Sequence, residues 1–140
     1  MPVLALPSVS LLFAAALGLL NVWLAVRASA TRIGRKVMVG DGQDPLMLAR
    51  MRAHANFVEY VPMALILMTL IELMGGRGTA LWVIGSLLVI GRVLHPFGME
   101  RPAPNPFRMT GIALTMLATV ALIGWAVWML MHPAGGRPIF

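Results

Sequence analysis

The sequence predicts an all-α integral membrane protein in which four transmembrane helices form a bundle. Hydrophobic residues make up 59% of the 140 residues, only 11% are charged, and the mean hydropathy is +0.85, which is far too apolar for an ordinary soluble domain. A helix needs about 20 apolar residues to cross a hydrocarbon core of roughly 30 Å, and runs of about that size occur four times. We therefore expect a single membrane domain over residues 1–140 with short connections.

Capping residues extend the predicted helices beyond the apolar runs at 3–26, 57–74, 79–94 and 107–131. Asp44 before Pro45 and Asn105 before Pro106 each combine an N-cap side chain with a proline at the first helical position. The expected helices lie at about 3–28, 45–74, 79–97 and 106–132. At 1.5 Å per residue the second is about 45 Å long, so its first turns can lie among headgroups or in a water-filled cleft.

Cysteine is absent from the sequence, which excludes disulfides, a cysteine nucleophile and thiolate metal sites. Any sulfur chemistry would have to come from a ligand. The net charge of +6 needs no nucleic acid to explain it. We interpret Arg32, Arg35 and Lys36 mainly as residues that fix the topology and contact anionic lipids, so we expect membrane lipids and no nucleic acid among the partners.

The distribution of basic residues predicts the orientation of the chain. Six of them belong to the first connection and its flanks, namely Arg27, Arg32, Arg35, Lys36, Arg50 and Arg52. Three belong to the third connection, namely Arg92, Arg101 and Arg108, and two to the opposite side, Arg77 and Arg137. Nine against two places the first and third connections in the cytoplasm and both termini on the outer side.

A polar stripe follows the second predicted helix. Arg52, Asn56 and Glu59 are spaced at i, i+4 and i+7, which puts them on one face of a helix with a neighbouring tyrosine, Tyr60. A structural seam in which an arginine neutralises Glu59 would explain this stripe. It would not explain the third helix, where an arginine and a histidine recur at i and i+3 near the same depth. A ligand site between the helices would explain both.

The charges around this proposed cleft are unbalanced. Arg27, Arg52, Arg92 and Arg108 stand against Glu59 alone, and a partly desolvated positive cluster favours an anionic ligand. Arg108 falls in the first turn of the fourth helix, where the helix dipole disfavours a cation and favours an anion. A thiol bound there would ionise more readily, and the thiolate is the nucleophile. Extension of Arg108 to the cytoplasmic interface explains its position equally well.

These residues resemble those of a known membrane family. Arg52, Asn56, Glu59, Tyr60 and Pro62 resemble the second-helix signature of the MAPEG family, the membrane-associated proteins in eicosanoid and glutathione metabolism. GRVLHPFGM (91–99) and PNPFRMTG (104–111) resemble the end of the third helix and the start of the fourth in its short bacterial members. The resemblance implies a left-handed bundle in the bacterial inner membrane, assembled as a homotrimer with glutathione bound between neighbouring protomers near the cytoplasmic face. Both termini would then be periplasmic.

Carried over residue by residue, the resemblance implies a glutathione site on the second helix. Arg52, Asn56, Glu59 and Tyr60 are similar to the positions that hold the glutathione backbone, its carboxylates and its amino group. His54 is similar to a neighbouring polar contact.

The resemblance also assigns residues on the other helices. Arg27 and Arg92 match arginines at the ends of the first and third helices, and His95 falls where a glutathione-contacting tyrosine or histidine is found. Arg108 resembles the arginine that stabilises the glutathione thiolate, if two extra residues are allowed in the third connection. Met99 departs from the pattern, because eicosanoid-handling members often have a tyrosine there.

The function implied is that of a glutathione transferase or glutathione-dependent peroxidase. Glutathione would be the cosubstrate, its thiolate would attack a lipophilic electrophile or hydroperoxide, and Arg108 would be the catalytic residue. Two other classes stay open. A non-catalytic lipid- or anion-binding protein would keep the fold without the thiolate site. A small multidrug transporter also has four short helices and a membrane glutamate, but such proteins often tolerate either orientation, unlike the nine-against-two distribution here.

Overall fold

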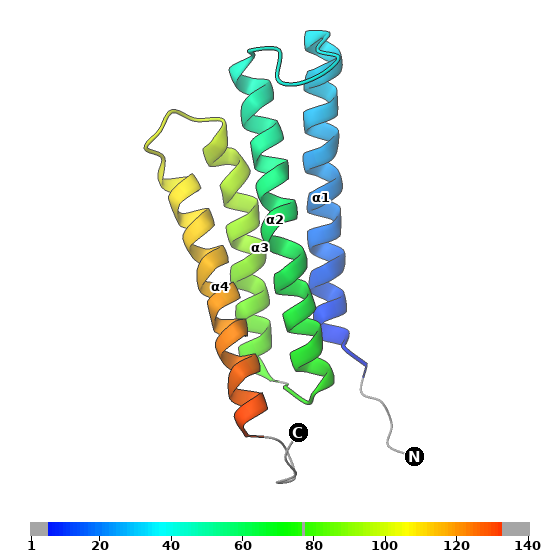
Figure 1. Cartoon of the computed structure of the whole chain (residues 1–140), viewed down its shortest axis with the longest axis vertical. Coiled ribbons are helices and arrows are strands. Elements are labelled where there is room, and N and C mark those ends of the chain that lie inside the picture. The colour runs from blue at the N-terminus through cyan, green and yellow to red at the C-terminus, as the bar shows by residue number, and fades with distance from the viewer. Residues whose placement is uncertain (1–5, 77, 133–140) are drawn as a thin grey trace.

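The computed structural model describes residues 6–76 and 78–132, which form four α-helices (Figure 1). They are α1 (Ser8–Arg35), α2 (Pro45–Leu73), α3 (Thr79–Met99) and α4 (Pro106–Met131). Each is long and apolar enough to cross a membrane, which confirms the predicted fold class. The α1–α2 and α3–α4 connections lie at one end of the bundle, the loop end, and the start of α1 and the end of α4 lie at the other, the terminal end (Figure 1).

The second and fourth helices begin where the capping residues predict. The Asp44 side chain accepts a hydrogen bond from the Met47 N–H at 2.8 Å, and the Asn105 side chain accepts one from the Phe107 N–H at 3.0 Å. A proline follows each cap at the first helical position. Because these signals are local, the sequence places both helix starts correctly.

The first helix continues to Arg35, past its predicted end at residue 28. The prediction ended the helix with the apolar run, but no proline interrupts residues 29–35. Lys36 caps the end of the helix: it adopts the left-handed conformation (φ 55°) and donates its N–H to carbonyl groups of the last turn. The described part of α1 begins at Ser8, and residues 3–5 of the predicted helix lie outside the described residues.

The four helices pack in two main pairs. The α3–α4 and α1–α2 contacts are the most extensive, α2 also touches α3 and α4, and α1 touches α3. Fully buried core side chains come from all four helices and include Leu17, Met68, Leu81, Leu88 and Leu122. Many other apolar side chains on the helices are exposed, as expected for surfaces that face lipid or another protein copy.

Glycines let α3 and α4 approach closely near the loop end. A Cβ added to Gly98 would lie 2.2 Å from the backbone nitrogen of Arg108, and one added to Gly111 would lie 2.8 Å from the backbone nitrogen of His95. Small residues commonly allow this backbone approach between membrane helices. The contact brings the segments that carry His95 and Arg108 together.

A buried carboxylate ties α1 to α2 at the terminal end. Glu72 is 3% exposed, and its two oxygens accept hydrogen bonds from the backbone N–H groups of Val9 at 3.0 Å and Ser10 at 2.7 Å. Both N–H groups belong to the first turn of α1, where Pro7 supplies no side-chain cap. Glu72 therefore caps α1 from another helix and faces the positive end of its dipole.

Replacing Glu72 by Gln tests this cap. One of the two accepting oxygens would become an NH₂ group facing an N–H donor, so we expect the free energy of unfolding to fall by about 1–3 kcal/mol. Unfolding in mixed detergent micelles measures the change. Glu59→Gln is the control, because that carboxylate is exposed on the same helix. Equal effects of the two substitutions would contradict the capping role.

Replacing Gly98 by Ala tests the close approach of α3 and α4. The new methyl group would overlap the Arg108 backbone, so the helices must separate and the free energy of unfolding should fall by about 1–3 kcal/mol. Gly124→Ala is the matched control, because nothing lies within 4 Å of a Cβ there. That control should be neutral or stabilising by up to about 1 kcal/mol. A neutral Gly98→Ala variant would show that the contact is loose.

Candidate functional site

A buried arginine joins α3 to α2 near the loop end. Arg92 is 1% exposed, and its Nη1 donates a hydrogen bond to the side-chain Oδ1 of Asn56 at 2.8 Å. Its Nε and Nη2 have no hydrogen-bond partner among the described residues. An arginine buried with unsatisfied donors is costly in free energy. The Arg92 guanidinium can therefore donate to a further acceptor.

Three more residues complete a group that we call the polar cluster: Asn56, Tyr60, Arg92, His95 and Arg108. His95 is 4% exposed, lies one turn from Arg92 on α3 and packs against the α4 backbone at Gly111, and Tyr60 lies one turn from Asn56 on α2. Arg108 is exposed in the first turn of α4. Residues of α2, α3 and α4 that the sequence assigned to one site thus come together.

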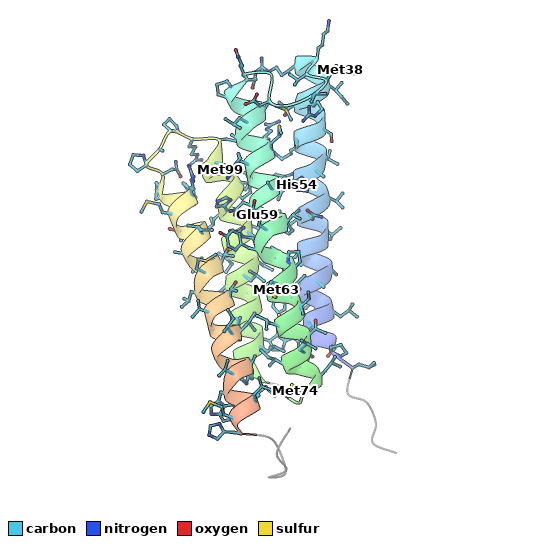
Figure 2. All side chains as sticks on the ribbon, viewed as in Figure 1. Met38, His54, Glu59, Met63, Met74 and Met99 are labelled. Atoms are coloured by element: carbon cyan, nitrogen blue, oxygen red, sulfur yellow. The ribbon has the colours of Figure 1, made fainter. Side chains whose placement is uncertain are left out.

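The two charged residues of the α2 stripe are exposed. Arg52 and Glu59 lie about one turn from Asn56 on either side along the helix, and both are open to the surroundings. Figure 2 shows Glu59 on α2, partway along the bundle. Neither makes a hydrogen bond or ion pair with the residues that the structure describes. Both side chains are therefore available to a ligand or to another copy of the chain.

His54 lies on a different side of α2 from Asn56. Its Nε2 donates to the side-chain oxygen of Asn21 in α1 at 3.0 Å, and Figure 2 shows it next to α1. It belongs to a groove of about 320 Å³, the α1–α2 groove, which is lined by Ala25, Ala28, Ser29, Arg32, Met47, Met51, His54 and Ala55. Within one copy of the chain, His54 and Asn56 do not face the same space.

Arg32 is a groove residue that the site prediction missed. Its guanidinium donates to the Val37 carbonyl at 3.3 Å and to the Met51 sulfur at 3.5 Å. It pairs with no acidic side chain in the described ranges 6–76 and 78–132. The sequence shows Arg32 only as one basic residue among several near the helix end, so the groove it lines could not be seen from charge alone.

Arg27 is committed to another partner. It forms an ion pair with Glu100, in the α3–α4 connection, and lies 4.4 Å from the centre of the Trp23 ring. Arg50 pairs with the same Glu100 oxygen at 2.9 Å and donates to the Thr31 hydroxyl at 2.7 Å. This network ties α1 and α2 to the connection, and no hydrogen bond or ion pair among the described residues joins Arg27 to the polar cluster.

The charge balance expected from the sequence therefore needs a correction. It set four arginines against one glutamate and omitted Glu100, which follows α3 directly and reaches back to neutralise Arg27. The stripe and the polar cluster keep three arginines and one glutamate, a net charge of +2 from Arg52, Arg92, Arg108 and Glu59. The position of Glu100 beside the predicted helix end is the signal that could have revealed this.

Comparison with known proteins identifies the family of the chain. The chain is similar to the "Inner membrane protein YecN" of Escherichia coli strain K12, with 28% identity over 120 residues that cover 86% of this chain and 91% of that protein. The protein of the same name from Escherichia coli O6:H1 matches to the same extent. The model of the MAPEG family matches residues 10–128, which include the whole polar cluster and the α1–α2 groove. The chain therefore belongs to the MAPEG family.

Proposed function

We propose that this protein is a glutathione transferase or glutathione-dependent peroxidase of the bacterial inner membrane. The observation that carries the proposal is the net charge of +2 on the stripe and polar cluster, together with the unsatisfied buried guanidinium of Arg92. Glutathione carries two carboxylates and one ammonium group, so its net charge is −1 as a thiol and −2 as a thiolate. The thiolate form balances the site, which favours ionisation of the bound thiol.

Four residues of the site then have separate roles. Arg52 and Asn56 bind carboxylates, Glu59 binds the amino group, and Arg108 stabilises the thiolate with help from the positive end of the α4 dipole. The thiolate attacks the electrophilic atom of a lipophilic substrate that arrives laterally from the bilayer. Stabilisation of the sulfur's negative charge by a fixed cation is the main catalytic term.

The separation of His54 from Asn56 supports a site shared by two copies. A ligand on the α2 stripe can reach the α1–α2 groove, with His54 and Arg32, only if that groove belongs to a neighbouring copy. Exposed apolar residues of α2 next to the stripe, including Met63, Ile66 and Leu70, supply area for association. A homotrimer that pairs these two unlike surfaces closes into a ring with three equivalent sites.

The expected orientation fits this arrangement. With the loop end in the cytoplasm and both termini in the periplasm, the arginine-rich surfaces face the compartment that contains glutathione, and the positive-inside rule is obeyed.

Arg108→Ala tests the thiolate. The purified protein in detergent, titrated with glutathione at neutral pH, should show a saturable ultraviolet thiolate absorbance, and the substitution should reduce it at least about tenfold because a cation next to the sulfur is lost. Arg101→Ala is the control: Arg101 is exposed in the neighbouring connection and stacks on Phe107, and its loss should leave the signal intact. If glutathione binds to the wild type without forming thiolate, the protein is a non-catalytic binder.

Mixed oligomers test whether two copies share the site. A shared site combines the polar cluster of one copy with the α1–α2 groove of its neighbour. Arg108→Ala disables the polar cluster and Arg32→Ala disables the groove, so each variant alone should lose the thiolate signal. When the two variants are coexpressed in equal amounts, a shared site is intact wherever an unmodified groove meets an unmodified cluster, which is about one quarter of sites in random cyclic trimers. Signal recovery near that level is expected. No recovery would place each site within one copy.

A further inference from the structure

The contact between Arg92 and Asn56 has a chemical direction. A guanidinium donates hydrogen bonds and cannot accept them, so the group facing Arg92 Nη1 at 2.8 Å must be the amide oxygen of Asn56. The NH₂ group of Asn56 is then directed away from Arg92. Rotating the amide by half a turn would set two donors against each other at a buried arginine, so one orientation is strongly preferred.

The orientation matters because Asn56 lies in the middle of the α2 stripe. It is half-buried, with exposed Arg52 about one turn before it and exposed Glu59 just under one turn after it. An asparagine that can rotate offers either a donor or an acceptor to a ligand. With its oxygen held by Arg92, Asn56 can offer only N–H donors to a molecule on the stripe.

The rest of the Arg92 guanidinium strengthens this effect. Nε and Nη2 are buried without a partner in the described part of the chain, so the positive charge is not neutralised locally. A cation bound to the amide oxygen polarises the amide and makes its N–H groups better donors. A nearby unbalanced positive charge also favours an anionic acceptor over a neutral one.

We propose that Arg92 is a positioning residue: it holds the Asn56 amide so that only N–H donors face the ligand, and it thereby makes Asn56 select a carboxylate. The inference rests on the proposed function, since the carboxylate is taken to be one of the two in glutathione. Arg92 acts through Asn56 and does not itself need to touch the ligand.

A purely structural role for Arg92 makes a different prediction. If the arginine serves only to join α3 to α2, Asn56→Asp should be harmless or better, because an aspartate has the same shape and forms a buried ion pair with Arg92. Under the positioning role, the same substitution replaces the outward N–H donors by a negatively charged oxygen that repels a carboxylate. Stability and binding then change in opposite directions.

The experiment compares full-length wild type, Asn56→Asp and Arg92→Met in detergent by thermal unfolding and by calorimetric titration with glutathione. We expect Asn56→Asp to keep or raise the midpoint of unfolding while its affinity for glutathione falls at least about tenfold. Arg92→Met should also weaken binding, because the amide is then free to rotate.

Two analogues identify the carboxylate. One has the glycine carboxylate esterified, and the other has the α-carboxylate of the γ-glutamyl residue as an amide. For one analogue, the modified group is the one that Asn56 contacts, so the wild type should bind that analogue more weakly than glutathione. In Asn56→Asp and in Arg92→Met, this difference in affinity should be at least about fivefold smaller. Such non-additivity is expected of groups in contact.

Three results would overturn the positioning role alone: Asn56→Asp binds glutathione as tightly as the wild type, it unfolds at a markedly lower temperature, or neither analogue shows coupling. A wild-type protein that binds no glutathione would overturn the proposed function, and the assignment of this carboxylate with it.

Discussion

A cation buried inside a membrane bundle is the constraint on which the loop end of this protein depends. Arg92 is almost completely enclosed, and its acceptors are the side-chain and backbone oxygens of Asn56 on another helix. Its Nε and Nη2 are buried without a partner among the described residues, which is costly in free energy. The neighbouring helices must therefore keep polar groups at this depth, and the glycines between α3 and α4 bring a histidine and a further arginine to the same place. The rest of the bundle holds these groups at fixed separations.

The three glutamates of the sequence show how position decides the role of one side chain. Glu72 is buried and receives backbone N–H groups from the start of α1. Glu100 is partly buried and is shared by two arginines from different helices. Glu59 is exposed, and no described residue pairs with it. The first two hold helices and connections together. The third makes no such connection among the described residues, which is why the proposed function assigns it to the ligand.

The sequence predicted those features that depend on residues close together in the chain. Asp44 and Asn105 marked helix starts because a cap acts within one turn, and apolar runs marked the spans. The spacing of Arg52, Asn56 and Glu59 gave one helix face. The partner of Arg27 could not be predicted in the same way, because Glu100 is 73 residues away and its approach depends on how the α3–α4 connection returns toward α1. Likewise, the helical period separates His54 from Asn56, but only the packing of α1 shows which space His54 faces.

The length of α1 has a consequence for the two solvents that meet at this protein. Because the helix runs on to Arg35, the α1–α2 groove extends past the apolar segment of α1. Arg32, Met47 and Met51 lie on the part of the groove nearest to the loop end, and Ala25 and Ala28 lie further along the apolar part of α1. A surface of this kind spans the boundary between the phases. In the proposed orientation, a hydrated molecule would reach this groove from the aqueous side and a lipophilic molecule would reach it from the bilayer.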